Sequence, residues 1–105
     1  MAGRISEEIS AIKFLVADVM LELRTAFDRD GLVEQMKAQR ARGYQVAWVE
    51  TGGEVLCVAG FVVGRKLAWG KHIYVDDLVT AARHRSTGAG RTMVDWLKAH
   101  ARSLG

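Results

Sequence analysis

The feature that most constrains the fold of this chain is a glycine-rich junction between a strand-like run and a helix-like run. Residues 84–94 read HRSTGAGRTMV; the strand-like HIYVDDLVT precedes them, and we predict a helix over residues 91–104. The first N–H groups of a helix have no intrahelical acceptor and carry partial positive charge. Gly88 and Gly90 let a ligand approach these groups with no Cβ in the way. The junction therefore predicts an anion site built mainly from backbone, with a phosphate as the usual ligand.

The side chains around the two glycines support this prediction. Arg85 and Arg91 add charge and donors suited to phosphate, and Ser86 and Thr87 add hydroxyl groups. Other glycine-rich motifs do not fit. A P-loop needs a lysine directly after its glycines, and a dinucleotide fingerprint needs a small residue where Met93 stands. A nucleophile elbow needs a glycine two residues before the serine, where this chain has a histidine.

Length and composition narrow the class of protein. The chain has 105 residues, half of them hydrophobic, which suits a single domain over residues 1–105. The formal net charge of +3 fits an anionic ligand or nucleic acid. A single cysteine excludes an internal disulfide and favours the cytoplasm. The polar start MAGRISEEIS does not resemble a signal peptide, and no apolar run approaches the roughly 20 residues that span a membrane.

Hydrophobic periodicity predicts the element order β–α–α–β–β–β–α, an α+β layered class. Gly43 is placed to cap a helix, and Gly60 inside an apolar run indicates a bulge or a close backbone approach. The Thr51–Gly–Gly stretch predicts a hairpin turn. The predicted elements are a short strand at 4–6, helices at 9–27 and 32–42, strands at 44–49, 54–64 and 72–80, a loop at 65–71, and the helix at 91–104.

The junction resembles a known coenzyme A loop. RSTGAG fits the pattern [Q/R]-x-x-G-x-[G/A] and is similar to the pyrophosphate loop of the GNAT superfamily of N-acetyltransferases. The preceding YVDDLVTAARHR resembles the strand and loop of that family's central motif, and the element order matches over nearly the whole chain. The resemblance implies a mixed sheet flanked by helices, and transfer of an acetyl group from acetyl-CoA to an amine.

The resemblance also implies roles for particular residues. Acyl-CoA would lie in an opening beside the strand at 72–80, its pantetheine arm bonded to strand backbone and its pyrophosphate in the loop. The residues implied are Leu78, Val79 and Thr80 for the arm, Arg85, Ser86, Thr87, Gly88, Ala89 and Gly90 for the pyrophosphate, and Arg91 beside it.

One departure from the family pattern leads to a further expectation. Family members continue past this helix into further strands, whereas nothing follows Gly105 here. We therefore expect the fold to lack its last strands and the strand at 72–80 to have an unpaired edge. Such edges pair with other strands, so we predict a homodimer or higher oligomer.

Two adjacent carboxylates on the strand are candidates for catalysis. Asp76 or Asp77 can accept the proton that the attacking amine loses. Alternation along a strand predicts that only one faces the substrate, while the other is solvated, caps a loop or pairs with an arginine. Tyr74 would share the face of Asp76, where it lines the amine site or simply packs.

No metal site is predicted. His72, His84 and His100 have no metal-ligand spacing, and Cys57 lies in an apolar run typical of a core residue. The tryptophans at 48, 69 and 96 fall on three different elements, which favours packing over base stacking.

The favoured function is therefore a GNAT-type N-acetyltransferase. Two alternatives stay open from the sequence: a non-catalytic module that binds coenzyme A or a protein, and a small basic domain that binds nucleic acid.

Overall fold

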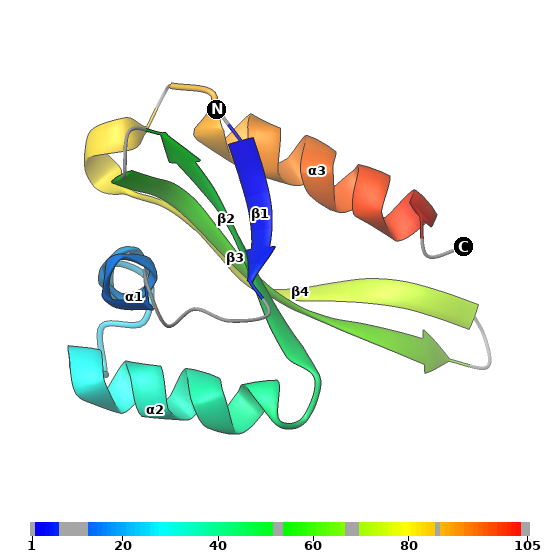
Figure 1. The fold of residues 1–105 in the computed structure, drawn as a ribbon, viewed down its shortest axis with the longest axis horizontal. Coiled ribbons are helices and arrows are strands. Elements are labelled where there is room, and N and C mark those ends of the chain that lie inside the picture. The colour runs from blue at the N-terminus through cyan, green and yellow to red at the C-terminus, as the bar shows by residue number, and fades with distance from the viewer. Residues whose placement is uncertain (1, 7–12, 52–53, 67–69, 86, 104–105) are drawn as a thin grey trace.

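The computed structural model describes residues 2–6, 13–51, 54–66, 70–85 and 87–103 (Figure 1). The elements, in chain order, are β1 (Ala2–Ser6), α1 (Lys13–Leu21), α2 (Arg29–Arg40), β2 (Tyr44–Thr51), β3 (Glu54–Lys66), β4 (Gly70–Thr80), a short 3₁₀ turn (Ala82–His84) and α3 (Ala89–Ser103). This order is the one predicted from hydrophobic periodicity.

The strands form one sheet in the order β1-β2-β3-β4. The α+β class predicted from the sequence is confirmed. The pairing differs from the expected mixed sheet, because each pairing among the described strands is antiparallel. Hairpins join β2 to β3 and β3 to β4, and a hairpin can join only antiparallel neighbours.

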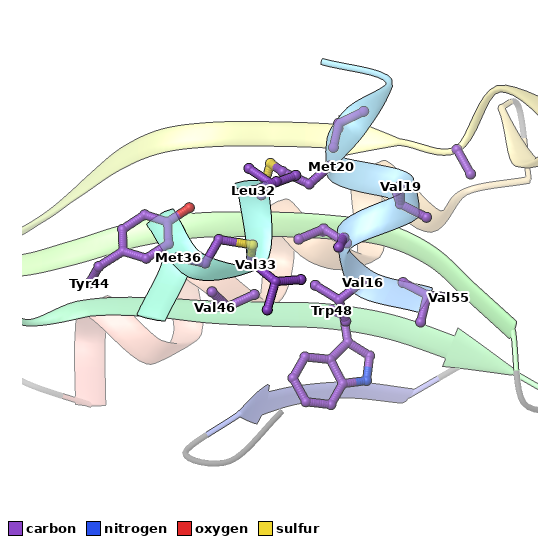
Figure 2. Packing of buried hydrophobic residues seen from close by; sticks show 14 residues of the cluster. Val16, Val19, Met20, Leu32, Val33, Met36, Tyr44, Val46, Trp48 and Val55 are labelled. Carbon is purple, nitrogen blue, oxygen red and sulfur yellow. The ribbon is translucent and has the colours of Figure 1, made fainter. Parts of the chain in front are cut away.

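Helices cover both faces of the sheet. Figure 1 shows α1 and α2 on one face and α3 on the other. Along β2, Val46 and Trp48 pack in the cluster with α1 and α2, whereas Ala47 and Val49 pack in the cluster with α3. The first cluster is drawn in Figure 2. Burial on both faces explains why β2 and β3 read as nearly continuous apolar runs.

The first helix is shorter than predicted. It was expected to run to Phe27, but it ends at Leu21, and residues 7–12 lie outside the described part of the chain. The N–H groups of Leu23 and Arg24 both bond back to the carbonyl of Met20, which closes the last turn. The chain then leaves the helix, and the residues Leu23 and Phe27 stay 41% and 40% exposed. The apolar residue at position 27 therefore does not belong to the helix; Phe27 lines a hollow described below.

Other boundaries moved by a few residues. The second helix begins at Arg29, because the Asp28 carboxylate accepts the N–H of Gly31 at 2.7 Å and caps the helix. Gly43 has φ +102°, as expected of a glycine that ends a helix. The expected loop at 65–71 is mostly strand, since β3 runs to Lys66 and β4 starts at Gly70; residues 67–69 are outside the described part.

A bulge interrupts the pairing of β3 with β4, as predicted at Gly60. Gly60 pairs with Asp77 but Phe61 pairs with Val75, so Asp76 is an extra residue on β4. The extra residue reverses which face the side chains of β4 occupy. Before the bulge, Ile73 packs in the α3 cluster; after it, Val79 packs with α1 and α2, although the two are an even number of residues apart.

The glycine at the bulge is required by Tyr44. A Cβ on Gly60 would lie 1.6 Å from the Tyr44 hydroxyl oxygen and 2.3 Å from Cζ of the same ring. Both Tyr44 and Gly60 are buried, and the Tyr44 hydroxyl is bonded to Asp77, so moving the ring aside would break this bond. The strand therefore carries glycine to let the ring cross it.

We expect Gly60→Ala to lower the free energy of unfolding by about 2–3 kcal/mol, the cost of overpacking a buried site. The matched control is Gly64→Ala on the same strand, where the new Cβ would meet the end of the half-buried His72 ring at 2.9 Å. This contact is longer and involves only the end of a side chain, so the control should lose less than ~1 kcal/mol. Urea unfolding curves give both values, and equal losses would show that Tyr44 does not dictate the glycine.

Candidate functional site

The glycine-rich loop has the backbone geometry of an anion site. Gly88 has φ +88° and directly precedes α3, and its Cβ position faces open space. The first α3 amide with a helical acceptor is that of Thr92, which donates to the Gly88 carbonyl at 2.9 Å. The N–H groups of Ala89, Gly90 and Arg91 come before it and have no partner within the helix. Several N–H donors are thus gathered where the chain turns into α3.

Thr87 was predicted to donate its hydroxyl proton to a phosphate, but it donates to the backbone of the loop. Its hydroxyl donates to the His84 carbonyl at 2.6 Å, and its N–H bonds to the same oxygen at 3.4 Å. The hydroxyl proton is therefore used to hold the loop closed instead of pointing to a ligand. Ser86, also predicted as a donor, lies outside the described residues.

A hollow of about 270 Å³ lies over this loop. Arg85 and Arg91 are both exposed at its rim, which makes it electropositive. Its described lining residues are Thr80, His84, Arg85, Gly88, Ala89, Gly90 and Arg91. The hollow thus joins the end of β4 to the start of α3, and of the predicted loop residues Arg85, Gly88, Ala89, Gly90 and Arg91 line it, whereas Thr87 does not.

Thr80 fixes the distance between β4 and α3. A Cβ on Gly90 would lie 3.2 Å from the Thr80 hydroxyl oxygen, so a larger residue at 90 would push the two elements apart. The same hydroxyl donates to the Cys57 sulfur at 3.6 Å. Burial raises the pKa of the Cys57 thiol, although the Thr80 contact acts in the opposite direction. Cys57 is a protonated core residue, as predicted, and not a nucleophile.

One edge of β4, the strand beside the hollow, pairs with no other strand of the described sheet. Residues 78–80 pair with β3, and β4 is the last strand of the described sheet. Leu78 is exposed, Thr80 half-buried and Val79 buried in the core. The outward backbone groups of this edge can therefore bond an extended ligand.

Asp77 is held from two sides. Nε of Arg24 donates to its Oδ1 at 2.7 Å, and the Tyr44 hydroxyl donates to its Oδ2 at 2.8 Å. Its side chain is only 12% exposed. Arg24 also donates to the Asp76 carbonyl at 3.2 Å, so one guanidinium is hydrogen-bonded to both residues of the bulge. The charge of Asp77 is compensated, whereas the Asp76 side chain is exposed to solvent.

Tyr44 stays protonated in this arrangement. Burial raises the pKa of its hydroxyl far above the usual range, and the hydrogen bond to Asp77 raises it further. Arg24 opposes these effects weakly. The phenol is therefore a permanent donor to Asp77 at neutral pH.

A second hollow, of about 390 Å³, opens beside the two carboxylates. The alternation argument predicted that only one of Asp76 and Asp77 would face a substrate, but both line this hollow because the bulge breaks the alternation. Tyr74 is not among the lining residues and is 58% exposed. The described lining residues are Met20, Arg24, Phe27, Leu32, Gln35, Met36, Gln39, Tyr44, Asp76 and Asp77.

Sequence reasoning did not find Arg24, Phe27 or Tyr44. Arg24 is 53 residues from Asp77, and Tyr44 is 33 residues from it, so no local spacing reveals the contacts. An arginine partner for one aspartate was considered, but its identity depended on where the first helix ended.

The described histidines and tryptophans that were weighed as ligands or stacking residues make contacts within the fold. The His84 ring is half-buried, with Nε2 3.3 Å from Oε2 of Glu54. Trp48 is buried in the core, and Trp96 stacks on His100 with centroids 4.8 Å apart. Within the described ranges, no three histidine, cysteine or acidic side chains are grouped as a metal site would require, and no helix is long and apolar enough to cross a membrane.

Comparison with known proteins agrees with this geometry. Residues 13–105 match the profile of the acetyltransferase (GNAT) family. The chain therefore belongs to this family of acetyltransferases. It is 27% identical over 88 residues to the uncharacterized N-acetyltransferase YhdJ of Bacillus subtilis (strain 168), an alignment that spans 83% of this chain and 62% of that protein.

Two solved structures share the fold. Ribosomal-protein-alanine N-acetyltransferase from Brucella melitensis biovar Abortus 2308 superposes with a TM-score of 0.80 at 17% identity, over 98% of this chain and 73% of that one. An aminoglycoside 6'-N-acetyltransferase complexed with coenzyme A superposes with a TM-score of 0.74 at 14% identity, over 98% and 56%.

We expect Tyr44→Phe to destabilise the fold by ~1–2 kcal/mol at pH 7, because it leaves Oδ2 of Asp77 without its donor. The raised pKa of Tyr44 adds a pH dependence. A group with a raised folded-state pKa contributes stability that is complete below the unfolded pKa of about 10 and is lost as the pH rises further. The difference between the parent and the variant should therefore shrink above about pH 10. Thermal unfolding from pH 7 to 11 measures it, and a constant difference would contradict the assignment.

Proposed function

We propose that this chain binds acetyl-CoA between β4 and α3 and transfers the acetyl group to an amine. The observation that carries the proposal is the turn into α3, where N–H groups without an acceptor in the helix lie beside a hollow that Arg85 and Arg91 line. Phosphate oxygens are the ligands best matched to such a cradle. Family membership supports an acetyltransferase, and coenzyme A is bound by one protein of the same fold.

The reaction needs few groups from the protein. The neutral amine attacks the thioester carbonyl, so a C–N bond forms and the C–S bond breaks. The nitrogen loses one proton to a carboxylate, directly or through water, and the departing thiolate takes a proton from solvent. The pantetheine arm would lie along the free edge of β4 at Leu78, Val79 and Thr80.

The two carboxylates would have different roles. Asp77 already accepts hydrogen bonds at both oxygens and is neutralised by Arg24, so it is poorly suited to take another proton. Asp76 is exposed and lines the same hollow. We therefore assign Asp76 to the amine and Asp77 to positioning the bulge. Tyr74 does not line this hollow, so we place it at the periphery of the amine site and give it no part in the proton transfer.

Self-association and compartment stay predictions. The unpaired edge of β4 carries the exposed side chains of Tyr74, Val75 and Leu78, which is consistent with pairing to a second copy. The cytoplasm was inferred from the single cysteine.

Arg91→Ala and Arg85→Ala should each weaken acetyl-CoA binding about tenfold, because each removes a charged donor to phosphate. Arg102→Ala is the control, since Arg102 is also exposed but lies at the other end of α3. Isothermal titration at two salt concentrations is the measurement. If the control weakens binding as much as the loop variants, net charge and not the loop controls affinity. Binding without turnover of any amine would favour the non-catalytic module.

Asp76→Asn should lower kcat by roughly 100-fold with acetyl-CoA affinity unchanged, because a general base acts after the cofactor binds. Asp77→Asn should instead lower the free energy of unfolding by about 2–3 kcal/mol through loss of the part-buried ion pair. Thiol release with a saturating amine, alongside urea unfolding, separates the two effects. Full turnover by the Asp76 variant would discard this residue as the base.

A further inference from the structure

The charge of the hollow beside the bulge favours a cation. Asp76, Asp77 and Arg24 are its three charged lining residues. Arg24 is paired with Asp77, so one carboxylate, that of Asp76, has no compensating charge within the lining. The described lining residues together carry one net negative charge, which attracts an ammonium group and repels a carboxylate or phosphate.

Arg24, the one cation among the described lining residues, is not available to an anionic ligand. Nε of Arg24 is bonded to the Asp77 carboxylate, and Nη2 is bonded to the Asp76 carbonyl. An anion that recruited this guanidinium in the same manner would have to displace these bonds. It would then leave the part-buried Asp77 without its counter-ion, which is costly.

The rest of the lining is largely apolar. Met20, Leu32, Met36 and Tyr44, all labelled in Figure 2, are 1–5% exposed and form its base. Phe27 lines the same hollow with 40% of its surface still exposed, and the glutamines at 35 and 39 add uncharged polar groups. An exposed aromatic ring beside a carboxylate can stack on a flat apolar group while the carboxylate holds an amine. The volume lies in the range of roughly 300–1,000 Å³ typical of small-molecule sites.

We infer that the acceptor is a primary amine carried on an apolar, preferably aromatic, body that has no carboxylate or phosphate. This inference rests on the proposed function for the acetyl transfer, but the recognition of the amine is a property of the hollow alone. In this assignment Asp76 selects the charge of the acceptor and Phe27 selects its body.

The test uses three small probes that differ in one group. Phenethylamine has the ammonium group and the ring, phenylalanine adds a carboxylate, and tyramine O-phosphate adds a phosphate. Each is titrated into the chain without acetyl-CoA and followed by amide chemical shifts. We expect phenethylamine to bind about tenfold more tightly than either anionic analogue. Equal affinity for the analogues, or no binding of phenethylamine at millimolar concentration, would overturn the inference.

Variants locate the binding in the hollow. Phe27→Ala should weaken phenethylamine binding about two- to tenfold through loss of ring contact. The control is Leu23→Ala, because Leu23 lies in the same connection between α1 and α2 and is 41% exposed but does not line the hollow. Asp76→Asn should remove most of the preference for phenethylamine over phenylalanine. If Phe27→Ala and Leu23→Ala have the same effect, or if the Asp76 variant keeps the full preference, the probe binds elsewhere.

The cofactor is titrated separately, so the two proposals can fail independently. Loss of acetyl-CoA binding would overturn the proposed function while the amine measurements still test the hollow. Acetyl-CoA binding and turnover with an anionic acceptor, but not with phenethylamine, would overturn only the acceptor class.

Discussion

The bidentate hold on Asp77 is the contact on which the site depends. Arg24 and Tyr44 bond its two oxygens, and they come from the connection after α1 and from the start of β2. A part-buried carboxylate without these donors would be destabilising, so the three residues have to assemble together. The Tyr44 ring reaches Asp77 by crossing Gly60, which is why the strand has a glycine there. The bulge at the same level then exposes Asp76.

This network also couples the two hollows through β4. The strand presents Asp76 and Asp77 at the bulge and, a few residues later, Thr80 at the contact with Gly90. A reaction between a cofactor on the loop and an amine at the bulge needs the two ligands held in fixed relation. One continuous strand, packed on both faces by the helices, supplies that rigidity.

The two hollows differ in the sign of their charge. Exposed arginines and N–H groups without an acceptor in the helix make the loop electropositive, whereas Asp76 at the bulge has no compensating charge among the described lining residues of its hollow. The two hollows therefore favour ligands of opposite charge at different places on the same strand, as the proposed cofactor and amine require. The assignment of Asp77 to a structural role follows from its compensated charge.

The sequence by itself determined the element order, the need for a bulge or a close backbone approach at Gly60, the cap at Gly43 and the loop at the start of α3. Each depends on local rules: periodicity, or a backbone conformation that glycine allows. It did not determine the end of α1, the roles of Arg24, Tyr44 and Phe27, or the difference between Asp76 and Asp77. Simple alternation failed there because a bulge adds one residue, and the partners of Asp77 are 33 and 53 residues away along the chain. Contacts over such separations are set by how the elements pack, and only the tertiary structure decided them.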